Sequence, residues 1–514
     1  MDFLLDAKQA KNLDIYTIQT IGIPSLVLME RASFLVTQEI QKRYAKNQVV
    51  KIFAGTGNNG ADGLAVARML LIQGYEVKIF VVGNLEKGTE EFRTQYNILD
   101  NMSAEIEILD TSVRYLEDDS AADDVTEAFE LCAKDVVVDG LFGIGLTRNV
   151  EGIYRQVIAK INQSDAVTIA IDIPSGLNAT TGEVMGICIK ADMTVTFGKK
   201  KTGHFLCEGK EYCGELVCDE IGYPDIAYRE SVPKKSRIYY LEPADFVNLP
   251  KRTETSNKGS YGSVSMVGGG ALMSGAVILS SQAAYRCGTG LVKIYTGKEN
   301  LDVVRSNSIE SVVHHFDAIY GVNFDKNKDV ICIGSGLSVS EETLQILQYV
   351  LKVDGKKIID ADALNLMAQN RELLEELNEN CILTPHVKEM SRLTGFEVSH
   401  IRKNAVKVAK DFSKEYNCIT VLKDAGTVIA GPNGEVVVNT SGNSAMSKGG
   451  SGDVLAGIIS ALVSQKMRMF EAAAMGVYLH GLAGDEASKE LGQYSVNASN
   501  LVDCIYKVFT KYNR

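Results

Sequence analysis

Strand-like apolar runs alternate with amphipathic helical stretches along both halves of the chain. In the first half the pattern predicts strands at 49–54, 75–82, 135–139 and 166–171, and a helix at 62–73. In the second half it predicts strands at 263–267, 291–295, 330–333, 357–359 and 419–422, and helices at 274–287 and 454–462. Such alternation is typical of parallel α/β sheets. The sequence therefore predicts an α/β protein with two doubly wound domains.

The length of 514 residues exceeds what one ordinary core supports, which also favours more than one domain. The segment 223–258 is rich in proline, basic and polar residues, as expected of a junction. We place the junction near residue 230, giving domains at 1–230 and 231–514.

The formal net charge of −12 argues against a general nucleic-acid binder, because nothing offsets phosphate repulsion. The ten cysteines include no Cys-x-x-Cys pair, a pattern typical of reduced thiols. The first residues lack a basic signal-peptide region, and no apolar run approaches the length of a membrane span. We expect a cytoplasmic protein that binds neither nucleic acid nor membrane.

A glycine-rich run at 442–453 opens directly into the predicted helix at 454–462. Glycines let the backbone wrap an anion, and the helix start supplies unpaired N–H groups and a positive dipole end. Asp453 lies where these features converge, so the run predicts a phosphoryl-transfer site. The alternative is an ordinary capped helix after a loop.

A second glycine-rich motif, Gly55-Thr56-Gly57-Asn58-Asn59-Gly60, lies between a predicted strand and a helix. It matches G-x-G-x-x-G, but the next strand does not end in the acid that a dinucleotide fold requires. An ordinary redox site is therefore not favoured, although the loop can hold a phosphate.

Polar residues also follow three predicted strands of the first half, where ligands of parallel sheets collect. The oxygens of Asn59, Asp139, Asp172 and Ser175 suit a hard cation, and one carboxylate could move a proton. The alternative is that Asp139 and Asp172 only cap turns.

These motifs, with Leu28-Met-Glu-Arg-Ala32 and Thr196-Phe-Gly198 through Lys201-Thr-Gly-His204, closely resemble the NAD(P)H-hydrate epimerase domain. The resemblance implies a Rossmann-like three-layer domain that interconverts the R and S forms of hydrated nicotinamide nucleotides and binds K⁺. It implies K⁺ ligands at Asn59, Asp139 and Ser175, and Asp172 as the proton-transferring group. It implies substrate contacts at Asn58, Asn59, Gly60, Ala61, Asp62, Gly143, Ile144, Gly145, Leu146, Thr147, Arg148, Asn149 and Asp172.

Two positions depart from the usual pattern of that family. Ala61 replaces a glycine, which is tolerated if its φ is negative. Ile144 replaces a threonine and so removes a hydroxyl that could contact a substrate phosphate.

The second half carries further motifs at predicted strand ends: Gly334-Ser-Gly336, Asp360-Ala-Asp362, Thr384-Pro-His386 and Lys423-Asp-Ala-Gly-Thr427. A hydrated nicotinamide ring carries a hydroxyl that leaves poorly until it is phosphorylated. That chemistry needs a base, which Asp453 supplies, and donors for the phosphoryl group, which the amides of Gly450 to Asp453 supply. A lone histidine such as His386 is usually structural, but its place after a predicted strand also allows a substrate contact. Asp360 and Asp362 are either a turn pair or a support for Mg²⁺.

Together these stretches, from about residue 240 to 505, resemble the nucleotide-dependent NAD(P)H-hydrate dehydratase of the ribokinase-like superfamily. The resemblance implies a ribokinase-like three-layer domain in which Gly336, His386 and Asp453 contact the hydrated substrate. It implies nucleotide contacts at Lys423, Asp424, Ala425, Gly426, Thr427, Asn443, Ser444, Ala445, Met446, Ser447, Lys448, Gly449, Gly450, Ser451 and Gly452. Ser335 departs from the pattern, because it replaces the usual proline of Gly-Pro-Gly.

By this resemblance we expect a bifunctional repair enzyme acting on NADHX and NADPHX, with ADP as co-substrate, Mg²⁺ in the dehydratase domain and a homo-oligomeric assembly. The first rival is a ribokinase-like kinase of a small alcohol, which would use the same anion hole and base. The fused epimerase-like half argues against it. The second rival is a non-catalytic nucleotide sensor that retains the fold.

Overall fold

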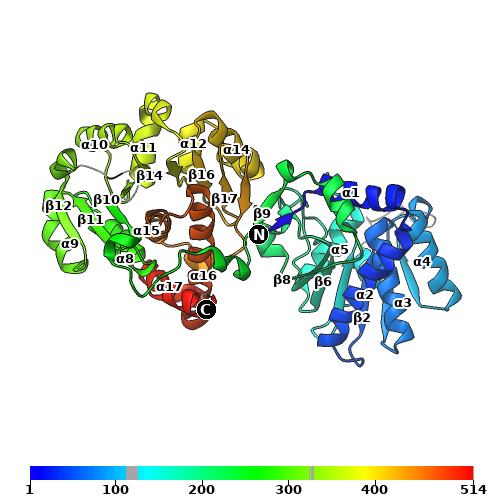
Figure 1. Ribbon diagram of the computed structural model, residues 1–514. Helices are drawn as coiled ribbons and strands as arrows, with labels where there is room; N and C mark the ends of the chain where they lie inside the picture. The colour runs from blue at the N-terminus through cyan, green and yellow to red at the C-terminus, as the bar shows by residue number, and fades with distance from the viewer. Residues whose placement is uncertain (111–124, 323–324, 326–328, 513–514) are drawn as a thin grey trace. The chain divides into compact units, whose positions relative to one another are not determined.

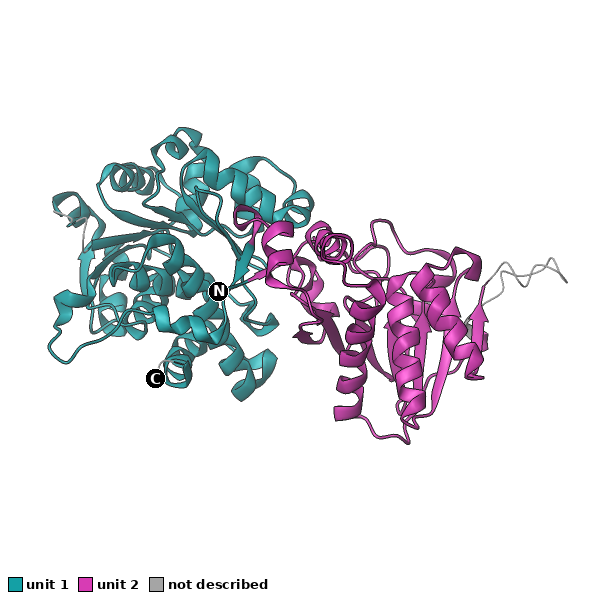
Figure 2. Ribbon diagram, turned by 45° about the vertical axis from the view of Figure 1, so that its right-hand side comes forward, with its two compact units in different colours: residues 1–2, 238–514 teal, residues 3–237 magenta. Residues whose placement is uncertain are grey.

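The computed structural model describes residues 1–110, 125–322, 325 and 329–512. The chain divides into an N-terminal unit of residues 3–237 and a C-terminal unit of residues 1–2 and 238–514 (Figure 2). The first strand, β1 (Asp2–Leu4), spans the point of division. The division before residue 238 follows helix α7 (Asp225–Ser231). The expected junction at residue 230 lies in this helix.

The N-terminal unit is built on one parallel sheet with the strand order β4-β3-β2-β5-β6-β7-β8 (Figure 1). The strands are β2 (Val50–Ala54), β3 (Val77–Val82), β4 (Ile106–Leu109), β5 (Val136–Gly140), β6 (Val167–Ile171), β7 (Met193–Phe197) and β8 (Glu215–Asp219). The helices are α1 (Ala7–Ile15), α2 (Ser25–Arg43), α3 (Asn58–Ile72), α4 (Glu90–Asn101), α5 (Gly152–Gln163), α6 (Gly209–Tyr212) and α7, with a π-helix, η1 (Tyr16–Ile21).

Alternate residues of each strand point to opposite sides of the sheet. Apolar residues therefore lie on both faces of this sheet, and helices cover both. Ile52 of β2 packs with α2, α3 and α4 in one apolar cluster. Phe53, the next residue, packs with α5 in another. The unit therefore has three layers, which confirms the predicted fold class.

The C-terminal unit contains a larger mixed sheet with the order β9-β18-β17-β16-β15-β14-β13-β10-β11-β12. The strands are β9 (Ile238–Tyr240), β10 (Ser263–Val267), β11 (Leu291–Thr296), β12 (Val312–His315), β13 (Asp329–Ile333), β14 (Lys356–Ile359), β15 (Cys381–Leu383), β16 (Ile419–Leu422), β17 (Val428–Ala430) and β18 (Val436–Val438). Strand β17 pairs antiparallel with both of its neighbours, and the remaining pairs are parallel.

Helices also cover both faces of the larger sheet (Figure 1). One layer contains α8 (Ser274–Arg286), α15 (Ser451–Ser464), α16 (Met469–Ser495) and α17 (Ala498–Tyr512), which share the main apolar core. The other contains α10 (Glu341–Lys352), α11 (Ala361–Gln369), α12 (Val387–Thr394) and α14 (Ala405–Glu415), and α9 (Leu301–Asn307) and α13 (Val398–Lys403) complete the unit. This unit is also three-layered, as predicted.

Helix α15 lies at the centre of that core, and its residues from Val454 to Ser464 are buried. It approaches α8 so closely that a Cβ on Gly457 would lie 2.2 Å from the Ser280 carbonyl oxygen. A larger residue at Gly457 would therefore push the two helices apart. This contact fixes the start of α15, where Asp453 lies.

None of the ten cysteines forms a disulfide in the part of the chain that the structure describes. Cys132 is exposed, Cys207 and Cys218 are half-buried, and the other seven are buried. Burial raises the pKa of Cys332 and of Cys418 to about 12. Among the residues that the structure describes, no helix is long and apolar enough to cross a membrane.

Candidate active sites

The loop after β5 brings the three predicted K⁺ ligands together in the N-terminal unit. The Ser175 hydroxyl donates to Asp139 Oδ1 at 2.5 Å, and the Ser175 amide donates to Asp139 Oδ2 at 2.7 Å. The Asn59 side-chain amide donates to the Phe142 carbonyl oxygen at 3.0 Å. The Ser175 hydroxyl lies 3.2 Å from the same oxygen. Asn59, Asp139 and Ser175 are all buried, so they form one enclosed cluster.

Within the described ranges, the Asp139 carboxylate pairs with no basic side chain. Burial raises the pKa of Asp139 to about 6, although hydrogen bonds from Ser175 and Leu141 oppose the rise. The bond from the Leu141 amide also shows that Asp139 holds a turn, as the alternative interpretation proposed. A buried carboxylate without a counter-charge, beside amide, hydroxyl and carbonyl oxygens, is a donor set that fits K⁺.

Asp172 binds a different set of side chains. Its Oδ1 accepts hydrogen bonds from Lys201 Nζ at 2.5 Å and from the Thr196 hydroxyl at 2.8 Å. Burial acts to raise the pKa of Asp172, but the charge and hydrogen bond of Lys201 outweigh it and lower the pKa. Asp172 also has a φ of 64°, a left-handed conformation that costs free energy outside glycine. The fold therefore holds Asp172 as a carboxylate in a constrained position.

Asp62, in the first turn of α3, has the opposite electrostatic environment. Burial raises its pKa well above the usual value, and the charges of Asp172, Asp14 and Glu91 add to the rise. Asp14 in turn accepts a hydrogen bond from the Tyr223 hydroxyl. The environment of Asp62 therefore favours its protonated form, whereas that of Asp172 favours the carboxylate. Two acids with pKa values pushed apart are the usual arrangement of an acid and a base in one site.

Helix α3 begins at Asn58, so the predicted start at residue 62 was wrong. The residues from Asn58 to Asp62 form the first turn of α3 rather than a loop before it. Ala61 is buried and is not among the residues with positive φ, so the alanine is tolerated there.

The predicted substrate loop at 143–149 lies between β5 and α5 and begins beside the cluster of Asn59, Asp139 and Ser175. A Cβ on Gly143 would lie 3.4 Å from the Asn59 Cβ. The Ile144 side chain is partly buried and packs with Ile173 and Leu177, so it does not replace the missing threonine hydroxyl.

In the C-terminal unit, the predicted anion hole is the start of α15. Gly450 precedes the helix with a φ of 90°, and no side chain caps the first turn. The Ser280 hydroxyl donates to the Asp453 carbonyl at 2.8 Å and lies 3.1 Å from the Ser335 hydroxyl. Ser335 in turn donates to the Asp453 carboxylate. The serine that replaces the usual proline therefore contacts the predicted base.

Asp453 has the electrostatics of a base that acts near neutral pH. Burial and the charge of Asp360 raise its pKa to about 6, whereas the Ser335 hydrogen bond and the charge of Lys423 oppose the rise. At pH 7 the group is therefore mostly ionised but more basic than an exposed aspartate.

An ion pair lies beside Asp453 and joins the ends of three strands. Lys423 Nζ donates to Asp360 Oδ1 at 2.8 Å, and the Thr384 hydroxyl donates to the same atom at 2.7 Å. The side chains of Asp360 and Lys423 are 2% and 19% exposed. A Cβ on Gly452 would lie 3.3 Å from Lys423 Nζ, so the ammonium group faces the predicted phosphoryl site.

Asp360 and Asp362 do not fit a Mg²⁺ site of their own. The Asp360 carboxylate is neutralised by Lys423, and Asp362 accepts hydrogen bonds from the Ser338 amide and the Asn365 side chain. The described residues contain no group of three or more His, Cys, Asp and Glu side chains that could hold a metal ion. We assign no protein ligands to Mg²⁺.

His386 caps α12 through one ring nitrogen, and the other, Nε2, lies 3.5 Å from Glu389 Oε1. Its Nδ1 accepts hydrogen bonds from the Lys388 and Glu389 amides at 3.0 and 3.2 Å. The Glu389 side chain accepts a hydrogen bond from the His386 amide, and burial raises the pKa of Glu389 to about 7. Because Nδ1 is an acceptor, the neutral ring carries its proton on Nε2. His386 is thus a structural cap of α12, and its contact with substrate stays a prediction.

The predicted nucleotide contacts lie on two loops. Residues 423–427 join β16 to β17, and residues 443–452 precede α15 and contain a short helix, η12 (Ser444–Met446). Asp485 of α16 fixes the second loop by accepting hydrogen bonds from the Gly442 amide and the Asn443 side chain.

The C-terminal substrate residues come from three elements. Gly336, in the loop after β13, has a φ of 59° and adjoins Ser335. The Lys423 amide donates to the Pro385 carbonyl, next to His386. Gly336, His386 and Asp453 are therefore linked through Ser335 and Lys423.

Sequence reasoning assigned no role to several residues that shape these sites: Asp14, Lys201, His204, whose Nε2 lies 3.0 Å from the Asp172 carbonyl oxygen, Tyr223, Ser280, Glu389, His480, whose Nε2 lies 3.3 Å from the Ser451 hydroxyl, and Asp485. Lys201 and His204 stand in a motif that was recognised, and the spacing of His386 and Glu389 is that of a capping box. Nothing in the sequence indicated the others, because their contacts are tertiary.

The folds and sites define a two-domain α/β protein with a buried cluster at Asn59, Asp139 and Ser175 in one unit and a glycine-rich helix start beside Asp453 in the other. Residues 264–507 match the NAD(P)H-hydrate dehydratase family, and residues 25–203 match the family described as YjeF-related protein N-terminus. The bifunctional NAD(P)H-hydrate repair enzyme Nnr of Thermofilum pendens is 35% identical over 511 residues, which are 97% of this chain and 94% of that protein. The enzyme of the same name from Escherichia coli is 32% identical over 489 residues, covering 95% and 90%. The chain belongs to the family of bifunctional NAD(P)H-hydrate repair enzymes.

A solved structure of the ADP/ATP-dependent NAD(P)H-hydrate dehydratase from Bacillus subtilis, co-crystallised with ATP and Mg²⁺, is 29% identical. The match covers 54% of this chain and 99% of that chain, with a TM-score of 0.49.

Proposed function

We propose that the chain repairs hydrated nicotinamide nucleotides in two steps. The N-terminal unit interconverts the R and S forms of NADHX and NADPHX, and the C-terminal unit dehydrates the S form with ADP. The observation that carries the proposal is the uncapped start of α15, with Asp453 beside it and the Asp360–Lys423 pair behind it. The fused organisation and the presence of both family halves favour this function over a kinase.

In the dehydratase site, Asp453 takes the proton of the ring hydroxyl, and the oxygen attacks the β-phosphoryl group of ADP. AMP leaves, while the amides at the start of α15 donate to the transferring group. The ring nitrogen then expels inorganic phosphate, and a proton leaves the adjacent ring carbon to give NADH or NADPH. Lys423 and the loops at 423–427 and 443–452 hold the nucleotide, and Mg²⁺ would accompany its phosphates.

In the epimerase site, the ring nitrogen assists the loss of hydroxide, and water adds to the other face of the resulting cation. Asp62, whose pKa is raised by burial, donates the proton to the departing hydroxide. Asp172, which is held ionised, stabilises the cation and takes the proton of the attacking water. K⁺ held by Asn59, Asp139 and Ser175 would neutralise the Asp139 charge beside the substrate loop at 143–149.

The test incubates the full chain with S-NADHX and ADP and follows the absorbance of the reduced nicotinamide ring. Recovery of that absorbance with release of AMP and phosphate supports the proposal. Asp453→Ala is expected to abolish turnover while the affinity for ADP stays within about tenfold, because the base acts mainly in the transition state. Asp302→Ala, at a side chain that is 99% exposed, is the matched control.

The same assay separates the rival functions. A stable phosphorylated product without recovery of absorbance would indicate a kinase. If the chain binds ADP but recovers no absorbance with either ADP or ATP, it is a nucleotide sensor.

A further inference from the structure

Asp172 is the central residue of a strained backbone turn just after strand β6. Its φ is 64°, and the Ile173 amide donates across it to the Ile171 carbonyl oxygen at 2.8 Å. A hydrogen bond of this span around a residue of positive φ marks the rare, strained type of γ-turn. A non-glycine residue relaxes from such a conformation unless the surrounding structure holds it there. The position of the Asp172 carboxylate therefore depends on the groups that hold this turn.

Two groups from outside the turn bind the backbone of Asp172. Its amide donates to the Val195 carbonyl oxygen of β7 at 2.8 Å, which continues the pairing of the sheet. Its carbonyl oxygen lies 3.0 Å from Nε2 of His204, at the end of the short helix η5 (Thr202–His204). No other side chain in the described ranges bonds to the Asp172 backbone. His204 is thus the side chain that holds the turn.

The His204 ring joins the backbone of Asp172 to that of Lys201. The Lys201 amide donates to His204 Nδ1 at 3.1 Å. Because Nδ1 is an acceptor, the neutral ring carries its proton on Nε2 and donates it to the Asp172 carbonyl oxygen. The residue is 1% exposed, and burial and the charge of Lys201 lower the pKa of His204 to about 3, so the ring is neutral at pH 7. One buried imidazole therefore spans the two chain segments that carry the Asp172–Lys201 ion pair.

This ion pair leaves one oxygen of the Asp172 carboxylate free. The Lys201 ammonium group donates to Asp172 Oδ1 at 2.5 Å and to the Thr196 hydroxyl at 2.8 Å. Its third proton goes to the Phe197 carbonyl oxygen at 3.2 Å. The Thr196 hydroxyl also donates to Oδ1, whereas no hydrogen bond from the described part of the chain reaches Oδ2. The side chain is 15% exposed, so Oδ2 is the oxygen that can take a proton from a water molecule.

We propose that His204 is a positioning residue of the epimerase, which holds the turn at Asp172 so that Oδ2 faces the reacting ring. Without the hydrogen bond from Nε2, the turn relaxes and the direction of the Asp172 side chain changes with φ. The Lys201 side chain does not prevent this change, because it binds Oδ1 and not the backbone of Asp172. His204 itself acts only through Asp172. The proposal rests on the proposed epimerase function.

Two substitutions separate the two hydrogen bonds of the ring. In His204→Gln, the side-chain amide nitrogen takes the place of Nε2 and keeps the donor to Asp172. In His204→Asn, the shorter side chain places its oxygen near the position of Nδ1 and keeps only the acceptor for the Lys201 amide. Because both variants are neutral amides, the comparison tests the hydrogen bond to Asp172 and not the polarity of the side chain.

The test follows the interconversion of R- and S-NADHX by chromatography without ADP, so that the dehydratase unit does not consume the S form. We expect kcat to fall about 100-fold in His204→Asn, because a small misplacement of a catalytic group costs about that factor. In His204→Gln the fall should be less than about tenfold, since the net value of one hydrogen bond is retained. KM should stay near the wild-type value in both variants, because His204 does not contact the substrate.

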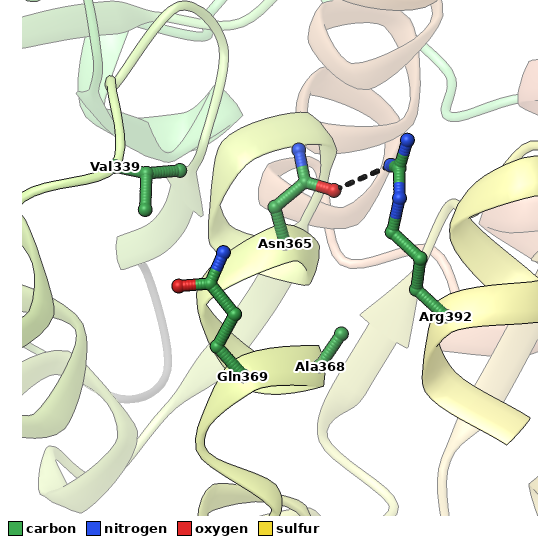
Figure 3. Close-up of a pocket in the computed structure, with 5 residues that line it drawn as sticks. All are labelled: Val339, Asn365, Ala368, Gln369 and Arg392. Carbon is green, nitrogen blue, oxygen red and sulfur yellow. Dashed lines mark hydrogen bonds between the residues drawn. The ribbon is translucent and has the colours of Figure 1, made fainter. Parts of the chain in front are cut away.

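Two control variants should leave the rate of epimerisation unchanged. Gln48→Ala removes the same kind of bridge before β2, where the Gln48 side chain accepts from the Ala45 amide at 3.1 Å and donates to the Lys134 carbonyl oxygen at 3.3 Å. Arg392→Ala removes a hydrogen bond to Asn365 in a surface pocket of the C-terminal unit (Figure 3). The first controls for a general loss of stability in the N-terminal unit, and the second shows that the assay reports on that unit alone.

Equal kcat in the wild-type chain and both His204 variants would overturn the proposal. An equal loss in His204→Gln and His204→Asn would also overturn it, because the hydrogen bond to Asp172 would then not determine the rate. So would a loss that appears in KM while kcat is kept. All rates are compared below the first unfolding transition of each variant, measured by scanning calorimetry. A wild-type chain that does not interconvert the epimers would instead overturn the proposed function, so the two failures are distinguishable.

Discussion

Removal of Lys423 tests whether the buried ion pair holds the dehydratase site together. Lys423→Met leaves the Asp360 carboxylate, 2% exposed, with the Thr384 hydrogen bond but without its counter-charge. Breaking a buried pair by removing one partner costs about 3–5 kcal/mol of unfolding free energy. The Lys423 side chain is 19% exposed, so solvent screening reduces this figure only modestly. For a unit of this size the loss corresponds to a fall in Tm of roughly 10 °C.

Scanning calorimetry of the full chain is the appropriate assay, because the two units need not unfold in one transition. One transition should shift in Lys423→Met and the other should stay in place. The double variant with Asp360→Asn should recover much of the loss, because it removes the unpaired charge, and the cycle gives the coupling energy.

The matched control is Lys407→Met, which breaks a surface pair with Asp411 whose side chains are 77% and 62% exposed. Such pairs contribute about 0–1 kcal/mol. If Lys423→Met shifts Tm no more than Lys407→Met, the ion pair does not stabilise the site and the reasoning fails.

Three further predictions concern activity. Asp453 must be ionised to act, and its pKa is raised to about 6. Dehydratase kcat/KM should therefore fall about tenfold per pH unit below pH 6 and level off above pH 7. A pH–rate profile that stays flat to pH 5 would contradict this assignment. Asp172→Asn should stop consumption of R-NADHX by the coupled reaction but spare S-NADHX, as measured by chromatography of both epimers, and equal use of both would refute the role of Asp172. Asp139→Asn removes the buried charge. The epimerisation rates measured with and without K⁺ should therefore differ less in this variant than in the wild-type chain. An unchanged dependence of the rate on K⁺ would count against the cation site.

Most of the fold could be predicted because its strands are short segments in which apolar residues predominate. The strand at 263–267 was predicted at its observed limits, since all five residues of β10 are buried and glycine follows. The start of α3 was misplaced because Asn58, Asn59 and Gly60 are poor helix formers that the fold overrides. Strands β17 and β18 have three residues each, too few for a periodic signal.

The candidate sites were predictable where glycine and acidic residues share a short motif, as at 450–453 and 58–62. They were not predictable where a side chain acts through a distant partner. Lys201 and Lys423 have no local pattern that assigns them to Asp172 and Asp360, although each pair determines the charge of its site. The opposite pKa directions of Asp62 and Asp172 also arise only from burial and neighbouring charges in the folded chain.

The distribution of the cysteines gives the chain a native attachment point for probes. The thiolate is the form that attacks thiol reagents, and burial keeps thiols such as Cys332 and Cys418 protonated and shielded. Cys132, the exposed one, should react with a maleimide first. A fluorophore attached there would report on the N-terminal unit without any engineered residue.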